Sequence, residues 1–477
     1  MARLVRRRTG FAGDRSAVAF ATFAQQEMWE LMRARGPDAG FHNLTRGLTL
    51  PAGHTVEDVL DRLAELLNRH ESLRTLFRLG SDGVLRQRIL GSGEFTVDIL
   101  LTTTAEDPDP RALGLRYEKR LHERAFDLAE ELPFRPLIEV TDGIPRAVTI
   151  CVPHVVADLT GLRTAVEELA WSLGASAAER AARPAPPQQV EQAEQERSPA
   201  ARRALARALR YLHEEFATRP RRMFEPAPGP PSYFSGVLES RAAALALNVL
   251  AIRHRVSTSV VLLAATAAVL GARTGRSACA LQLVAGNRFT ATSRAAVANL
   301  IQEVPVTIRL DGRGFDDLVR ATWAATMRAY RHSRFPPDRC AELRAEAEMA
   351  RGTPVHLCCF FNDARTTVRA VQTPDGPGSL RAALAETTFH PADYRERHTF
   401  SLFVLDGPGT IRLVLAADTR ALPPPEVERY LRTVEGLLVE LAVEDRAVAA
   451  VLERLDAAEL PSSGRLGDAP RFVLGPS

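Results

Sequence analysis

One histidine and one aspartate lie four positions apart directly after a run of strand-forming residues. The stretch PHVVADLTG runs from Pro153 to Gly161 and contains His154 and Asp158. Histidine is the side chain best suited to take and return a proton near neutral pH. Taken alone, such a pair is more typical of a core histidine satisfied by hydrogen bonds. The surrounding sequence has to decide between a catalytic and a structural pair.

The neighbouring residues predict that this pair lies at a strand-to-helix turn. Val148 to Val152 is β-forming, and the apolar spacing from Gly161 to Trp171 is typical of a helix. Catalytic groups of α/β folds often lie at such turns. Upstream, Val56 to Arg69 predicts an amphipathic helix with Thr55 as its N-cap, and Gly80 to Gly83 predicts a hairpin turn.

A similar alternation of helices and strands recurs in the second half of the chain. Helices are predicted at 242–253, 258–271, 315–330 and 424–443, and strands at 280–284, 304–310, 356–361, 399–405 and 410–416. The stretch 177–200, rich in Pro, Ala, Gln and Glu, is typical of a linker. We therefore expect an N-terminal tail (1–17), an N-terminal lobe carrying His154 (18–176), the linker (177–200), a C-terminal lobe (201–460) and a C-terminal tail (461–477).

The composition excludes several classes of protein. The 477 residues are 45% hydrophobic and 25% charged, as in ordinary folded proteins, and the net charge of +3 is scattered, which argues against nucleic-acid binding. No run approaches the ~18 apolar residues that span a bilayer, so we expect no membrane segment. The 5 cysteines show no CxxC spacing, which argues against disulfides and a metal site and favours a cytoplasmic location.

Several residues outside the pair are expected to be structural. We place Trp29, Trp171 and Trp323 in the core, because each lies on an apolar face. The sequence Arg69-His70-Glu71-Ser72-Leu73-Arg74 belongs to a helix-to-strand corner, and its two arginines are expected to fix that corner through carboxylate pairs.

Several stretches resemble, in order and spacing, the signature motifs of condensation domains from nonribosomal peptide synthetases. The first two are TFAQQEMW (22–29) and NRHESLRTLF (68–77), and PHVVADLTG then falls where the family has its HHxxxDG active-site motif. Further matches are 124–137, VAGNR (284–288), VANLIQEVP (297–305) and the closing strands and helix of 400–441. The resemblance covers about residues 18–455, and this chain looks like a freestanding condensation domain.

The resemblance implies an α/β (α+β) architecture with two chloramphenicol-acetyltransferase-like lobes in a V-shaped pseudodimer around a central tunnel. It also implies an acyltransferase that makes an amide or ester in nonribosomal peptide, antibiotic or other natural-product biosynthesis. The donor would be an acyl or aminoacyl thioester on the phosphopantetheine arm of a carrier protein, and the nucleophile would be an amine or an alcohol. The protein would bind no cofactor of its own, and we expect a monomer.

By the same resemblance, His154 matches the functional histidine of the motif and Asp158 matches its aspartate, for which Arg288 is the expected partner. Whether the histidine deprotonates the nucleophile or orients and assists it electrostatically stays open. The residues expected to line the tunnel are Pro153, Leu159, Gly161, Gln302 and Asn362.

Departures from the family pattern leave alternatives open. Pro153 replaces the first histidine, Gln302 replaces an asparagine, and Leu159 replaces a glycine that would let substrate approach the backbone. A leucine there fits either an unusual substrate or a catalytically silent condensation-like protein that recruits a carrier protein or a tailoring enzyme. A coenzyme A-dependent acyltransferase is a third possibility, ranked behind a carrier-protein donor because the chain lacks a DFGWG motif.

Overall fold

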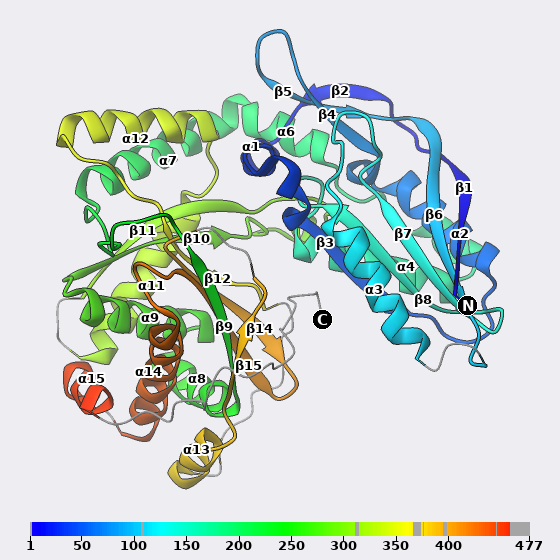
Figure 1. Cartoon of the computed structure of the whole chain (residues 1–477). Helices are drawn as coiled ribbons and strands as arrows, with labels where there is room; N and C mark the ends of the chain where they lie inside the picture. The colour runs from blue at the N-terminus through cyan, green and yellow to red at the C-terminus, as the bar shows by residue number, and fades with distance from the viewer. Residues whose placement is uncertain are drawn as a thin grey trace. The chain divides into compact units, whose positions relative to one another are not determined.

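The computed structural model describes residues 2–105, 109–310, 314–365, 374, 376–394, 398–444 and 446–457 (Figure 1). These residues form two compact units. Unit 1 contains the chain up to Ala204 together with residues 286–302, and unit 2 contains residues 205–285 and the described chain from Glu303 onward. Both units mix helices with β-sheet, which confirms the α/β class. The expected C-terminal tail (461–477) lies outside the described residues.

The main sheet of unit 1 carries PHVVADLTG at the end of one of its strands. Its order is β1-β6-β7-β8-β3, and only β6 and β7 are parallel to each other. The strands are β1 (Arg3–Ala12), β6 (Ser92–Thr102), β7 (Arg135–Thr141), β8 (Ile144–Pro153) and β3 (Asn43–Thr49). A second, antiparallel sheet has the order β2 (Ala17–Phe20), β5 (Leu85–Ile89), β4 (Thr75–Leu79), and its β4–β5 turn is the predicted hairpin.

The helices of unit 1 cover these sheets and the loops between them. They are α1 (Phe23–Arg35), η1 (Gly36–His42), α2 (Val56–Arg69), η2 (Glu71–Arg74), α3 (Pro110–Glu123), α4 (Leu159–Gly174), α5 (Ala177–Ala182), α6 (Gln189–Arg197) and α10 (Ala291–Arg294). The bounds of α2 are those predicted, because Thr55 and Asp58 form a capping box at its start. Its buried leucines pack in one hydrophobic core with Val148, Ile150 and Val152 of β8.

Unit 2 is built on a seven-stranded sheet. Its order is β11 (Gln302–Arg309), β10 (Ala278–Ala285), β12 (Cys359–Asp363), β14 (Phe400–Gly407), β15 (Thr410–Asp418), β9 (Tyr233–Ser240), β13 (Thr388–Ala392). Its helices are α8 (Arg241–His254), α9 (Thr258–Thr274), α11 (Phe315–Arg331), α12 (Pro337–Arg351), α13 (Pro377–Leu384), α14 (Pro424–Val443) and α15 (Val448–Ala457), and α7 (Pro199–Thr218) begins in unit 1 and continues into unit 2.

Helix α9 is the longest apolar stretch of the chain, and every residue from Val260 to Gly271 is buried in the core of unit 2. Among the described residues, no single helix has the length and apolarity needed to cross a membrane. Helices α8 and α9 would meet that test only as a pair, and they are bent by 105° at the break between them.

Three expected boundaries differ from the structure. Residues 286–302, expected within the C-terminal lobe (201–460), belong to unit 1. The stretch 1–17, expected to be a tail, contains β1, which pairs with β6 from Arg3 opposite Leu101 to Ala12 opposite Ser92. Its exposed arginines obscured the strand, because an edge strand that faces solvent needs few apolar residues.

The expected linker (177–200) instead forms α5, α6 and the start of α7, and it belongs to unit 1. Val190 and Ala193 of α6 are buried, and Gln188 donates a hydrogen bond to the carbonyl oxygen of Arg69 at 2.9 Å. These few contacts attach a polar segment that has no apolar periodicity of its own.

The expected burial of the tryptophans is wrong for two of the three. Trp171 and Trp323 are 38% and 50% exposed, respectively. Trp171 lies under the guanidinium of Arg183, 4.3 Å from its ring centre, so a cation–π contact covers it in place of the apolar core.

Candidate functional site

The site begins where β8 ends. Pro153 is opposite Asn43 of β3, and the next residue, His154, donates its main-chain N–H to the carbonyl oxygen of His42 at 2.8 Å. Hydrogen-bonded and non-bonded pairs alternate along antiparallel strands, so the ring nitrogen of Pro153 faces away from β3. On the other side of β8, the pairing with β7 ends at Cys151, so Pro153 has no partner in that strand. The proline therefore takes the place of the first motif histidine without removing a hydrogen bond from the sheet.

Asp158 closes the loop and starts the next helix. It is buried, and its Oδ1 accepts a hydrogen bond from the N–H of Gly161 at 2.8 Å as the N-cap of α4. The same oxygen accepts from Nη2 of Arg288 at 2.7 Å, and Oδ2 accepts from the N–H of Leu300 at 3.1 Å. The expected ion pair between Asp158 and Arg288 is therefore present. Because both carboxylate oxygens are engaged, this aspartate holds the loop in place.

Arg288 connects the loop to the returning segment 286–302. Besides Asp158, its guanidinium donates to the carbonyl oxygens of Ser293, Ala296 and Ala298 at 2.7, 2.9 and 2.9 Å. The preceding Asn287 has a φ of 52°, in the left-handed region where asparagine is among the commonest non-glycine residues. These contacts make segment 286–302 part of unit 1 although it follows the end of β10.

Gly161 is required by packing. A Cβ atom at this position would lie 2.7 Å from the carbonyl oxygen and 2.9 Å from the nitrogen of Ala298. Both distances are shorter than a carbon atom tolerates, and both contacts are with main-chain atoms. The glycine thus allows the start of α4 to approach segment 286–302 closely. This packing role differs from the tunnel-lining role expected from the sequence.

All three early motifs contact this same segment. In the first, the main-chain oxygen of Ala24 accepts from the side chain of Asn299 at 3.1 Å. In the second, the hydroxyl of Ser72 donates to the main-chain oxygen of Val297 at 2.7 Å. In the third, the N–H of Asp158 donates to the main-chain oxygen of Ala298 at 3.1 Å. Segment 286–302 is the shared support of the three motifs.

His154 itself has an electrostatic environment that favours the neutral imidazole. Burial lowers its pKa, and the opposing effects of a hydrogen bond with its own main chain and of the Asp158 charge are smaller. Nδ1 is shielded from solvent, and among the described residues no other residue hydrogen-bonds to it. The residue as a whole is only partly buried.

The Arg69–His70 corner is held by a carboxylate, as expected. Glu168 of α4 lies 2.7 Å from Nε of Arg69 and 3.3 Å from Nε2 of His70. Burial would raise the pKa of Glu168, but the hydrogen bonds and charges of His70 and Arg69 outweigh burial and lower it to about 2. The expectation for Arg74 is only partly met, because its hydrogen bonds go to the carbonyl oxygens of Leu67, Arg15 and Leu90.

The remaining predicted site residues are distributed over both units. Leu159 is the first residue of α4 and is partly exposed, and Gln302 is buried and donates to Glu27 of α1 at 3.1 Å. Asn362 lies on β12 of unit 2, opposite Phe403 of β14, and is partly buried. Unit 1 therefore contains all the predicted site residues except Asn362.

Two contributors were not found from the sequence. His42 supports His154 through its main-chain oxygen, a contact that any residue type can make, so no sequence signal announces it. Ser72 acts through its side chain, and its place inside the RHESLRT motif was the available signal. No cluster of three or more His, Cys, Asp or Glu residues suited to a metal ion occurs within the described ranges.

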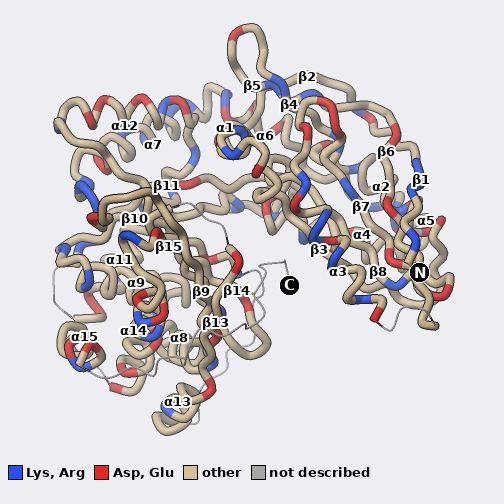
Figure 2. The backbone as a smooth tube through the Cα atoms, in the orientation of Figure 1, with Lys and Arg blue, Asp and Glu red and all other residues tan. Residues whose placement is uncertain are grey.

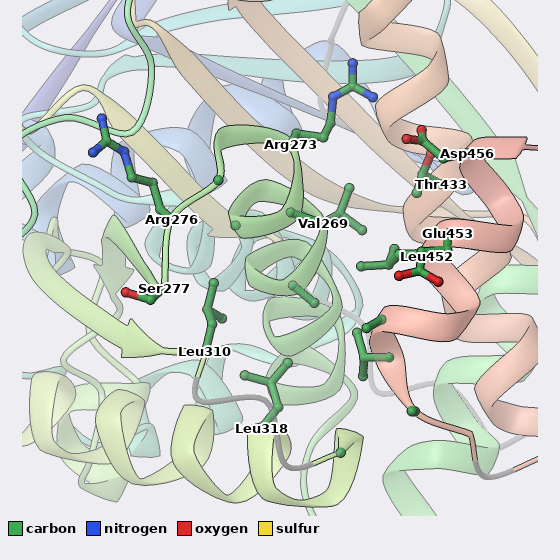
Figure 3. A pocket seen from close by; sticks show the side chains of 18 of the residues that line it. Val269, Arg273, Arg276, Ser277, Leu310, Leu318, Thr433, Leu452, Glu453 and Asp456 are labelled. Carbon is green, nitrogen blue, oxygen red and sulfur yellow. The ribbon is translucent and has the colours of Figure 1, made fainter.

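One cavity of unit 2 does not include any of the predicted site residues. Its volume is about 1230 Å³, and α9, α11, α14 and α15 line it (Figure 3). Two of its arginines, Arg273 and Arg429, share the single carboxylate of Glu426.

Comparison with known proteins identifies the family. The family model named Condensation domain matches residues 16–356. The chain belongs to the condensation domain family. Over 150 residues it is 33% identical to the probable non-canonical nonribosomal peptide synthetase CymA of Salinispora arenicola, and over 440 residues it is 24% identical to chondramide synthase cmdD of Chondromyces crocatus. These matches cover 31% and 87% of this chain, but it spans only 2% and 11% of the length of those two proteins.

Solved condensation domains share its fold. A starter condensation domain of rhizomide synthetase RzmA, solved with C8-CoA and Leu-SNAC, has a TM-score of 0.69 at 17% identity, with 93% of this chain and 98% of that chain covered. The SgcC5 protein of Streptomyces globisporus, solved with a naphthyl ethanediol and sucrose, has a TM-score of 0.67 at 17% identity, with 90% and 99% covered. The predicted chloramphenicol-acetyltransferase-like condensation fold and its link to natural-product synthetases are confirmed.

Proposed function

We propose that this condensation domain is an acyltransferase that joins an acyl or aminoacyl thioester to an amine or an alcohol, with His154 as its catalytic residue. The observation that carries the proposal is a partly buried histidine with a lowered pKa, at the end of β8, in a loop fixed by Asp158 and Arg288. A neutral histidine held in one position is what proton transfer to or from a nucleophile requires.

The tautomer follows from the surroundings of the ring. The residue's own main chain raises the pKa and so favours a protonated ring nitrogen, and we assign that proton to the buried Nδ1. Nε2 then carries the free lone pair and is the atom that meets the nucleophile. Because the pKa is lowered, this lone pair is available at neutral pH.

The reaction is balanced without a redox step or a cofactor of the protein. The nitrogen or oxygen of the nucleophile forms a bond to the thioester carbonyl carbon, the carbon–sulfur bond breaks, and the proton of the nucleophile ends on the leaving thiol. In one version Nε2 carries that proton between the two sites. In the other version the imidazole orients the nucleophile and stabilises the developing charge. Asp158 supports either version by fixing the loop.

For the donor, we propose a phosphopantetheine thioester on a carrier protein. The relatives are nonribosomal peptide synthetases, and the motif spacing is that of condensation domains. Coenzyme A has the same arm, and one starter condensation domain was solved with C8-CoA, so both donors belong in the test. Leu-SNAC in that structure and a diol in the SgcC5 structure are the reason to test both amine and alcohol acceptors.

Leu159 supports a second candidate, a catalytically silent domain that recruits a carrier protein or a tailoring enzyme. Its side chain does not belong to the hydrophobic core of unit 1 within the described residues, so packing does not explain a leucine where the family has glycine. The intact His154 and Asp158 favour catalysis.

The test compares the wild-type protein with His154→Ala. Each is incubated with octanoyl-loaded carrier protein or octanoyl-CoA and with a panel of amines and alcohols, and products are followed by mass spectrometry. His213→Ala is the matched control, because this histidine is exposed on α7 of unit 2. We expect product from the wild type and the control, with a loss of about 10²–10⁴-fold for His154→Ala. Equal rates for all three would overturn the role of His154, and carrier binding without product would favour the silent domain.

A further inference from the structure

Helix α11 of unit 2 has an outer face with an unusual composition. Phe315, Val319 and Ala329 point into the core, as expected for an amphipathic helix. On the outside, Trp323 and Met327 are 50% and 36% exposed and stand one turn apart. A large exposed tryptophan beside an exposed methionine has no role in the packing of this unit.

Arginines from two helices lie near the C-terminal end of α11, where their charges act on His332. Arg328 and Arg331 lie on α11, and Arg207 and Arg210 lie one turn apart on α7 (Figure 2 marks the charged residues along both helices). The helices are in contact through Tyr211 of α7. Its ring lies 5.2 Å from the guanidinium carbon of Arg328 and is stacked on His332, with ring centres 5.5 Å apart.

Most of this positive charge is uncompensated. Arg328 is paired with Glu214, but no carboxylate within the described residues lies within 4.0 Å of Arg207, Arg210 or Arg331. The positive charge of these arginines acts on His332. Burial is the largest cause of the lowered pKa of this histidine, and the charges of Arg328, Arg207, Arg331 and Arg210 lower it further.

We propose that Arg207, Arg210, Trp323, Met327 and Arg331, here called the α7–α11 surface, dock an acidic protein surface that presents an apolar side chain. Exposed tryptophan, methionine and arginine side chains on neighbouring helices have the composition of protein–protein interfaces, in which aromatic anchors and arginines supply most of the binding energy. The arginines complement carboxylates and raise the association rate. Resting on the proposed function, the inference names the partner as the carrier protein that presents the thioester.

Two other kinds of partner fit the surface less well. A nucleic acid would need a longer basic stripe, whereas this chain has 61 Lys and Arg against 58 Asp and Glu. A membrane surface would need a broad apolar face, whereas most large apolar residues of α11 point into the core.

The experiment separates docking from chemistry. The variants are Arg207→Glu/Arg331→Glu and Trp323→Ala, and the matched control is Arg241→Glu/Arg381→Glu, which makes the same charge change on exposed residues of α8 and α13. Binding to a set of octanoyl-loaded carrier proteins of differing surface charge is measured by titration calorimetry. Transfer kinetics are measured with the same carriers and with octanoyl-pantetheine, which has the arm but no carrier protein.

We expect the surface variants to weaken carrier binding and raise KM for the acyl-carrier at least tenfold, with kcat and the rate with octanoyl-pantetheine unchanged and with the control like wild type. The effect should shrink at high salt. Unchanged carrier binding in the variants, or equal losses with both donors, would overturn the proposal. The proposal would also be overturned if the wild-type protein bound none of the carrier proteins. It would be overturned likewise if the wild type bound RNA or anionic vesicles instead and the surface variants lost that binding. Carrier binding that depends on the surface, without transfer from any donor, would support docking while refuting the proposed catalysis.

Discussion

The buried carboxylate of Asp158 and the guanidinium of Arg288 are 2.7 Å apart and 130 positions apart in the chain. This pair fixes the turn after β8 to segment 286–302. The aspartate therefore holds in place the loop that carries His154.

Removing the arginine should destabilise unit 1. In Arg288→Ala, Asp158 would stay buried without its cation, which typically costs about 3–5 kcal/mol. Adding Asp158→Asn should restore part of this loss, because a neutral amide tolerates the site better. Urea denaturation followed by circular dichroism measures the change. An Arg288→Ala protein as stable as wild type would show that the pair does not hold the loop.

Gly161→Ala should disturb the contact between the start of α4 and segment 286–302. Its Cβ would lie 2.7 Å from the carbonyl oxygen of Ala298, so the main chain must shift, and we expect a loss of about 1–3 kcal/mol and slower transfer. Gly174→Ala, near the end of the same helix, has no atom within 4 Å of its Cβ and should be neutral or stabilising by up to about 1 kcal/mol. Equal stability and equal transfer rates for Gly161→Ala and Gly174→Ala would contradict the packing role of Gly161.

The pH dependence of transfer should reflect His154. Its pKa is lowered from the ordinary value of 6.5, so the neutral, reactive form persists below that pH. We expect kcat/KM to fall only when the pH drops below this lowered value. Between pH 6.5 and that value the unfolded chain binds a proton that the folded protein does not, so the histidine's contribution to stability decreases as pH falls. A buried, neutral base would be contradicted if kcat/KM were half-maximal at pH 6.5 or above and if variants of the other titrating groups kept that midpoint.

Leu159 should limit the size of the substrate. Leu159→Gly is expected to raise kcat/KM for bulky acceptors several-fold and to leave small acceptors unchanged, at a stability cost of about 0.5–1 kcal/mol for glycine in a helix. Leu159→Ala should be intermediate. Competition between a small and a bulky amine, read by mass spectrometry, measures the shift. An unchanged product ratio would remove Leu159 from the specificity determinants.

Acid should weaken the corner formed by Arg69, His70 and Glu168. The pKa of Glu168 is lowered from 4.5 to about 2, so its contribution is complete above pH 4.5 and is lost as the pH falls toward 2. By linkage this contribution is about 3 kcal/mol. Stability curves between pH 6 and 2 should show this loss in wild type and not in Glu168→Gln. Parallel curves for the two proteins would contradict it.

The sequence predicted helices and strands well where the capping residues and the apolar spacing agree. Helix α2 begins at Val56 and ends at Arg69 as predicted, because its cap and its apolar stripe agree. The Asp158–Arg288 pair was predicted from the family resemblance, since nothing local connects residues so far apart. By contrast, the strand at Arg3–Ala12 was missed, because pairing with β6 supplies its stability and its own side chains are mostly exposed.

The supporting contacts of the site were harder to predict. The hydrogen bond from His154 to the main-chain oxygen of His42 depends on backbone position alone. The motif predicted Gly161 as a site residue, but its close contact with the main chain of Ala298 is visible only in the folded structure. The exposure of Trp323 was mispredicted because an apolar residue on a helix is assumed to face a core, whereas here its outward position is what suggests a partner.

Because segment 286–302 belongs to unit 1, this unit is discontinuous in the chain. During synthesis, Asp158 leaves the ribosome long before Arg288, and β9, α8, α9 and β10 are made in between. Long-range closure of this kind slows folding. A fragment that stops at Ala204 would contain all three early motifs and yet lack the residues that organise them, so the N-terminal half cannot complete its packing ahead of the rest of the chain.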